Sequence, residues 1–210
     1  MNALLLDWSG TLVDDFTPTV YATNEVFKAY GLPTWSADEF REQFYLPYPQ
    51  FYADILPDVP LAEIELIFQR TFLDCPQPVT ILEPTMAFLQ WAHRAGIRLF
   101  ILSSMDAQNF EVQARRFGVL DLFEATYAGV QNKCDLIPEI LANHDLVPEK
   151  TGFVGDMVHD VHAAQAVGVQ SVAVFSGYDS AQVLAAESPT LMLNDIGKLR
   201  AVIEACQPVA

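Results

Sequence analysis

The sequence predicts an α/β fold in which helices cover both faces of a parallel β-sheet and a helical unit is inserted after the first strand. Two observations support this prediction. Short apolar runs that end at Gly, Ser or Asp alternate with stretches of helical periodicity, which is typical of right-handed βαβ crossovers. Residues 16–78 break the alternation and show helical patterns only.

The predicted strands are short and continuously apolar, as expected for strands buried on both faces of a parallel sheet. The first, residues 3–6, ends at Asp7. The others are residues 97–102, 151–154, 170–175 and 190–193. Helices are predicted between them at residues 84–94, 107–117 and 158–167, each followed within two residues by a glycine that can end a helix.

The inserted segment is predicted to form helices at residues 19–30, 37–44 and 61–73, joined by loops that contain proline. A chain of 210 residues is long enough for one α/β core and a small accessory domain. We therefore expect a core domain at residues 1–15 and 79–210, with a helical cap domain at residues 16–78.

The net charge of −16 disfavours binding to nucleic acid or to anionic membrane surfaces. The N-terminal MNALLLDWSG has no basic region and too short an apolar run for a signal peptide or a membrane span. Three cysteines without CxxC spacing suggest neither a disulfide framework nor a zinc site. These features predict a cytoplasmic protein with no nucleic-acid or membrane partner.

Polar residues that could carry chemistry occur in a fixed order along the chain. Asp7 leaves the first strand in LLLDWSGTLVDD, and Ser103 leaves the second in FILSSMD. Lys133 follows in QNKCDL, and FVGDMVHD supplies Asp156 and Asp160. Each residue alone has an ordinary explanation as a turn residue, a helix cap or a solvated lysine. The carboxyl ends of parallel strands meet at one edge of the sheet, so we expect Asp7, Ser103 and Asp156 to lie there.

This ordered set resembles the four motifs of the haloacid dehalogenase (HAD) superfamily, and the sequence is similar to its phosphoglycolate phosphatase and β-phosphoglucomutase branch. The resemblance implies a Rossmann-like core with a C1-type helical cap. It also implies that Asp7 is the nucleophile, Ser103 a donor to phosphate, Lys133 the charge partner, and Asp156 with Asp160 the acidic metal motif.

The chemistry of such a reaction calls for a metal ion, since a carboxylate that attacks a phosphate dianion meets like-charge repulsion. A divalent cation held by Asp7, the carbonyl of Ser9 and Asp156 would reduce this repulsion, and Mg²⁺ suits oxygen ligands. Asp160 is expected to complete the acidic motif, where it orients Lys133 or a metal-bound water.

Phosphate needs positive charge and hydrogen-bond donors around its equatorial oxygens. The predicted donors are Lys133, Ser103, Ser104 and the N–H groups of Gly10 and Thr11 in the turn after Asp7. We therefore expect Mg²⁺-dependent hydrolysis of a small phosphorylated metabolite, a phosphate monoester, through an aspartyl-phosphate on Asp7.

Ser9 departs from the family pattern, because phosphatases of this family usually have a second Asp there that acts as general acid and base. That contribution is typically worth about 10²- to 10⁴-fold in rate. The substitution leaves two alternatives open: a catalytically weak domain that binds a phosphorylated ligand or partner, and a phosphotransferase. His159 is a minor candidate for the missing acid–base group, although a structural histidine is the commoner case.

Two further branches of the superfamily fit less well. Phosphonoacetaldehyde hydrolases have an opening that resembles DWSGT, but they use a cap lysine, and the predicted cap has only Lys28, with none in residues 41–52. Haloacid dehalogenases need no metal and usually lack paired acids such as those of VGDMVHD.

Overall fold

The computed structural model describes residues 1–206, which form two compact units. The first comprises residues 1–13 and the chain from residue 81 onward, and the second comprises residues 14–80. The chain passes between the units in β2 (Val13–Asp14) and β3 (Thr80–Ile81), which pair as a two-stranded sheet.

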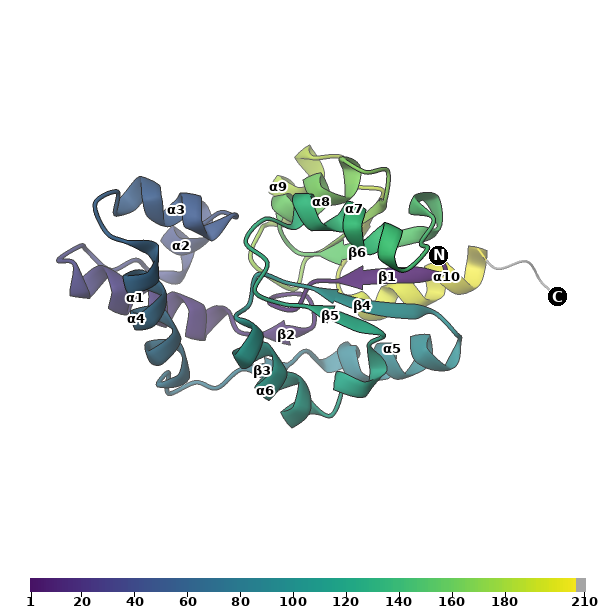
Figure 1. Ribbon diagram of the computed structural model, residues 1–210, viewed down its shortest axis with the longest axis horizontal. Coiled ribbons are helices and arrows are strands. Elements are labelled where there is room, and N and C mark those ends of the chain that lie inside the picture. Colours follow the sequence, from purple (N-terminus) through teal and green to yellow (C-terminus); the bar gives the residue numbers. More distant parts are fainter. Residues whose placement is uncertain (207–210) are drawn as a thin grey trace. The chain divides into compact units, whose positions relative to one another are not determined.

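The first unit is built on a six-stranded sheet in the order β5-β4-β1-β6-β7-β8 (Figure 1). Every neighbouring pair is parallel, so the predicted α/β class is confirmed. The strands are β1 (Ala3–Leu6), β4 (Arg98–Leu102), β5 (Ala125–Tyr127), β6 (Thr151–Gly155), β7 (Gln170–Val174) and β8 (Leu191–Leu193). All four residues of β1 are buried at the centre of the sheet, which explains why ALLL is continuously apolar.

Helices cover both faces of this sheet (Figure 1). Successive side chains of a strand point to opposite faces, so Leu5, Phe100 and Phe153 share one face and pack against Ile137 and Ala164 of α7 and α8. The other face is covered by α5, which buries Phe88 and Leu89. The helices are α5 (Glu83–Arg94), α6 (Ala107–Phe117), α7 (Lys133–Asn143), α8 (Val158–Gln165), α9 (Ala181–Ala186) and α10 (Leu199–Cys206), with 3₁₀ turns at Leu120–Leu122, Pro148–Lys150 and Ile196–Lys198.

The second unit is helical and has its own apolar core. Its helices are α1 (Phe16–Ala29), α2 (Ala37–Gln43), α3 (Tyr48–Ile55) and α4 (Leu61–Leu73). The core includes Val26, Phe27, Phe51 and Ile64. Ser36 forms a capping box with Glu39, which fixes the start of α2. Within residues 1–206, no helix has both the length and the apolar character needed to cross a membrane.

Several elements were not predicted from the sequence, and β5, α7 and α3 show the reasons. The strand β5 is short and lies at the edge of the sheet, so its residues alternate between partly buried and exposed and make no apolar run. Pro138 lies inside α7, where proline removes a backbone hydrogen bond and normally argues against a helix. The short helix α3 begins directly after Pro47 and has a second proline in its first turn.

Candidate active site

The candidate site lies at the carboxyl ends of the three central strands. Asp7 follows β1, Ser103 follows β4 and Asp156 follows β6. The parallel register pairs Leu6 with Ile101 and with Val154, so the chain leaves these strands at the same level. The backbone N–H of Asp7 also donates to the carbonyl of Val154, at 2.9 Å, which continues the ladder into the site.

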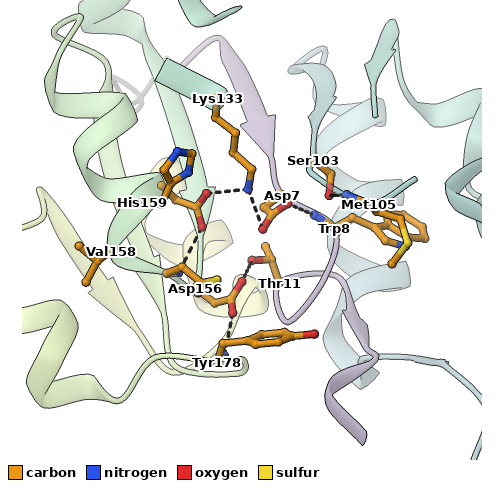
Figure 2. Close-up of polar contacts among 12 residues, drawn as sticks. Asp7, Trp8, Thr11, Ser103, Met105, Lys133, Asp156, Val158, His159 and Tyr178 are labelled. Carbon is orange, nitrogen blue, oxygen red and sulfur yellow. Dashed lines mark hydrogen bonds and ion pairs between the residues drawn. The ribbon is translucent and has the colours of Figure 1, made fainter. Parts of the chain in front are cut away.

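Lys133 connects two of the acidic residues (Figure 2). Its Nζ lies 2.9 Å from Oδ2 of Asp7 and 2.7 Å from Oδ1 of Asp160. All three side chains are buried. Burial by itself would lower the pKa of Lys133, but the carboxylates of Asp160 and Asp7 outweigh it and raise that pKa above its usual value. Lys133 therefore stays charged beside the predicted nucleophile.

The carboxylate of Asp7 is held from both sides. Its Oδ1 accepts a hydrogen bond of 2.7 Å from the backbone N–H of Trp8, while Oδ2 faces Lys133. Burial raises the pKa of Asp7; Lys133 opposes this shift, and the nearby charge of Asp160 adds to it. One carboxylate oxygen is thus fixed by the backbone and the other is paired with an ammonium group.

Asp156 also has a partner for each oxygen. Its Oδ1 accepts from the hydroxyl of Thr11 and its Oδ2 from the backbone N–H of Tyr178, both at 2.8 Å. Burial, together with the charges of Asp7 and Asp160, raises the pKa of Asp156 well above the usual range. The site therefore holds more negative charge than Lys133 can balance.

A divalent cation fits this donor set. Carboxylate oxygens of Asp7, Asp156 and Asp160 all lie within 4.8 Å of one another. Three carboxylates beside one ammonium group leave an excess of two negative charges, which equals the charge of one divalent ion. Oxygen ligands of this kind suit Mg²⁺ or Ca²⁺ rather than softer metals.

Glycine is required at two positions around Asp156. Gly10 has φ of 70°, in the left-handed region that favours glycine, and a Cβ there would collide with the carboxylate of Asp156. A Cβ at Gly177 would collide with the same carboxylate. The turn after β1 and the loop after β7 can therefore approach Asp156 only because neither residue has a side chain.

The remaining predicted residues lie at the same edge of the sheet but differ in their contacts. The hydroxyl of Ser103 accepts from the N–H of Met105 at 3.3 Å, and the Oγ of Ser104 is buried with no hydrogen-bond partner among residues 1–206. The N–H of Gly10 donates to the carbonyl of Val13 at 2.9 Å, and is thus engaged within its own turn. Ser9 is half-buried and forms a β-bridge with Val13.

The loop after β7 belongs to the site, although no motif in the sequence pointed to it. The hydroxyl of Ser176 donates to the carbonyl of Gly10 at 2.8 Å, and Oδ2 of Asp179 accepts from the N–H of Val158 at 2.7 Å. With the N–H of Tyr178 on Asp156, these bonds connect the loop to the turns after β1 and β6. The available signal was position, since FSGYDS follows the carboxyl end of another parallel strand.

The two histidines near Asp160 have different surroundings. The Nε2 of His159 lies 3.3 Å from Oδ1 of Asn132, and its Nδ1 is buried with no hydrogen-bond partner in the described chain. Burial first, and then the charge of Lys133, lowers the pKa of His159 to about 4, so its ring is neutral at physiological pH. The exposed His162 contacts Glu187 at 2.6 Å.

Comparisons with known proteins agree with this architecture. The family model of haloacid dehalogenase-like hydrolases matches residues 4–174. A phosphoglycolate phosphatase from Synechococcus elongatus is 30% identical over 201 residues, which cover 92% of each chain. One from Pseudomonas putida is 23% identical, over 97% of this chain and 79% of the relative.

Solved structures show the same fold. A haloacid dehalogenase-like hydrolase from Streptococcus pneumoniae superposes with a TM-score of 0.85 at 22% identity, covering 97% of this chain and 98% of that one. A CbbY variant from Rhodobacter sphaeroides, solved with xylulose-(1,5)bisphosphate, gives 0.78 at 23% identity, covering 95% and 96%. With its family match over residues 4–174, this chain belongs to the haloacid dehalogenase-like hydrolases.

Proposed function

We propose that this hydrolase is a phosphatase that cleaves small phosphate monoesters through transient phosphorylation of Asp7. The observation that carries the proposal is the buried Lys133, whose ammonium group lies between the carboxylates of Asp7 and Asp160. An ammonium group held beside a buried nucleophile can offset the charge of an incoming phosphoryl group without a large rearrangement.

The proposed reaction has two steps. In the first, a carboxylate oxygen of Asp7 forms a bond to phosphorus while the ester P–O bond breaks, and the leaving oxygen takes a proton from solvent water to become the alcohol. In the second, water attacks phosphorus and gives a proton to solvent while the bond between Asp7 and phosphorus breaks, which releases inorganic phosphate and restores the carboxylate. Lys133 and the hydroxyls of Ser103 and Ser104 would stabilise charge on the equatorial oxygens in both steps.

The acidic cluster is proposed to bind Mg²⁺ through Asp7, Asp156 and the carbonyl of Ser9, with Asp160 holding Lys133 beside them. When bound, the ion would reduce the repulsion between Asp7 and phosphate and polarise a phosphoryl oxygen. Gly10 and Thr11 contribute by shaping the turn: Gly10 leaves room for Asp156, and the Thr11 hydroxyl orients it.

The helical unit, residues 14–80, is proposed to be the cap domain that excludes water during turnover. Phosphoglycolate is the first substrate to test, because it is the named substrate of the curated relatives. Sugar phosphates and bisphosphates follow, since the CbbY variant was solved with xylulose-(1,5)bisphosphate. Such metabolites would place the enzyme in the cytoplasm.

A phosphate-release screen tests the proposal. Purified protein is assayed with Mg²⁺ over phosphoglycolate, sugar phosphates, nucleotides and an aryl phosphate, and again with chelator. We expect turnover that chelator abolishes and added Mg²⁺ restores. Asp7→Asn should eliminate turnover with the fold intact, because an amide cannot form the acyl phosphate. Full activity in chelator, or comparable turnover by the variant, would contradict the mechanism.

Ser9 supports a second candidate function, in which the chain binds a phosphorylated ligand or partner and turns over only weakly, or transfers the phosphoryl group to another acceptor. A hydroxyl at that position cannot act as an effective general base. Calorimetry with the same phosphate esters separates the candidates: binding without phosphate release favours the binding role, and a phosphorylated acceptor favours transfer.

A further inference from the structure

A buried glutamine interrupts the apolar face of α6. Residues Phe110, Gln113, Ala114 and Phe117 recur at the spacing of one helical face, and Gln113 is only 6% exposed. A buried side-chain amide is unfavourable unless it is hydrogen-bonded. The amide of Gln113 is hydrogen-bonded to a residue distant in the sequence: its Oε1 accepts a hydrogen bond of 2.9 Å from the indole Nε1 of Trp8.

Trp8 connects this helix to Asp7. Its backbone N–H donates to Oδ1 of Asp7 (Figure 2), and its ring is fully buried. The indole packs edge-on against Phe110, with ring centroids 4.9 Å apart, and lies 6.4 Å from the ring of Phe117. The hydrogen bond to Gln113 adds a directional contact to this packing.

The same helix starts at the loop that carries Ser103. Asp106 caps α6 by accepting from the N–H of Asn109 at 2.9 Å, and Met105 just before it donates to the Ser103 hydroxyl. Thus α6 contacts the Ser103 loop at its beginning and Trp8 about two helical turns later. A shift of Trp8 relative to α6 would change the placement of Asp7 relative to Ser103.

We propose that Gln113 is a positioning residue for the proposed phosphoryl transfer, acting through Trp8 on the carboxylate of Asp7. The inference rests on the proposed function. Replacing both partners of a buried hydrogen bond by apolar groups can leave stability nearly unchanged, whereas removing one partner leaves the other unsatisfied. Phenylalanine does not fill the space of the buried Trp8 ring, so the effect of each variant on the rate is compared with its effect on stability.

The test compares Gln113→Met, which keeps the volume and removes the acceptor, with Gln113→Glu, which keeps an acceptor oxygen. Gln165→Met, on the exposed face of α8, is the matched control. We expect Gln113→Met to lower kcat about tenfold with KM within about twofold, since small misplacements of reacting groups cost rate more than binding. Gln113→Glu should recover most of the rate at low pH, where a protonated carboxyl mimics the amide, and Gln165→Met should match wild type.

A double-variant cycle tests the route through Trp8. Trp8→Phe with Gln113→Met should be no slower than the slower single variant, because both changes break one hydrogen bond. The fluorescence of Trp8, taken as wild type minus Trp8→Phe, should change in Gln113→Met. Rates that fall only in proportion to stability would overturn the proposal, as would additive effects of the two changes or an unchanged rate in Gln113→Met.

The positioning role of Gln113 can be tested even if the protein has no phosphatase activity. If wild type releases no phosphate from any ester, the phosphatase proposal fails. The positioning role is then measured by the binding of Mg²⁺ with beryllium fluoride, a phosphoryl mimic that attaches to a carboxylate. Weaker binding in Gln113→Met than in wild type and Gln165→Met supports the role, and equal binding refutes it.

Discussion

Thr11 donates a hydrogen bond of 2.8 Å from its hydroxyl to Oδ1 of Asp156, a residue 145 positions away in the sequence. Both side chains are fully buried. The bond favours the ionised form of Asp156, against the burial and the neighbouring charges that raise its pKa. It therefore favours the charged form of a residue that is proposed to bind Mg²⁺.

Thr11→Val is expected to weaken Mg²⁺ binding, because valine keeps the shape but removes the donor that favours the charged carboxylate. The midpoint of a Mg²⁺ titration, followed by activity or by Tm, should rise severalfold. Thr151→Val is the control: Thr151 is equally buried but donates to the carbonyl of Val147 at the opposite end of β6. The interpretation fails if both variants shift the midpoint equally, or neither does.

Lys133→Met should lower kcat/KM at least tenfold, since it removes the charge beside Asp7 while filling the same space. The unfolding free energy in chelator should fall by about 3–5 kcal/mol, the usual effect of leaving buried charges without their partner. Steady-state kinetics and urea unfolding measure the two effects. Lys150 is exposed, and Lys150→Met should change neither quantity. An unchanged kcat/KM in Lys133→Met would show that Lys133 has no role in catalysis.

Ser9 should make the two half-reactions unequal with an aryl phosphate, whose leaving group needs no protonation. Phosphorylation of Asp7 would be fast, and hydrolysis of the acyl phosphate slow for lack of a base. Rapid mixing should therefore show a burst of about one aryl alcohol per site before the steady state. Ser9→Asp should raise the steady rate and shrink the burst. No burst, together with no acceleration in Ser9→Asp, would mean that another residue supplies the base.

His159 gives a prediction for pH. The native ring has a pKa lowered to about 4 by burial, so the unfolded chain binds more protons than the native protein between that value and the ordinary pKa near 6.5. The contribution of the neutral His159 ring to the free energy of unfolding is complete above pH 6.5 and is lost as the pH falls to 4. His159→Gln should relieve about 1 kcal/mol of this loss at pH 5, after allowance for partial exposure.

Urea unfolding of wild type and His159→Gln at a series of pH values provides the measurement. The difference between the two proteins should vary between pH 4 and 6.5 and be constant above pH 7, which serves as the internal control. A difference that is constant over the whole range would show that His159 titrates normally in the native protein.

Local patterns in the sequence were sufficient for much of the fold. Continuous apolar runs predicted the central strands because both faces of a parallel sheet are buried. Helical periodicity followed by glycine predicted α6 with the bounds that the structure shows, residues 107–117. The position of Asp7, Ser103 and Asp156 after parallel strands was enough to expect them at one edge, since that depends only on strand direction.

Only the tertiary structure decided how these residues contact one another. Pro138 argued against the helix α7, so the position of Lys133 at the start of a helix was not predicted. The resemblance implied Lys133 as the charge partner, and the structure shows its ammonium group within ion-pair distance of both Asp7 and Asp160. The loop after β7 reaches Asp156 because Gly10 and Gly177 leave space for it, and Gln113 accepts a hydrogen bond from Trp8, which lies 105 positions away in the sequence. Sequence periodicity is a local property, whereas each of these contacts joins segments that the sheet topology brings together, so the chain determined which groups were present and the fold determined which of them meet.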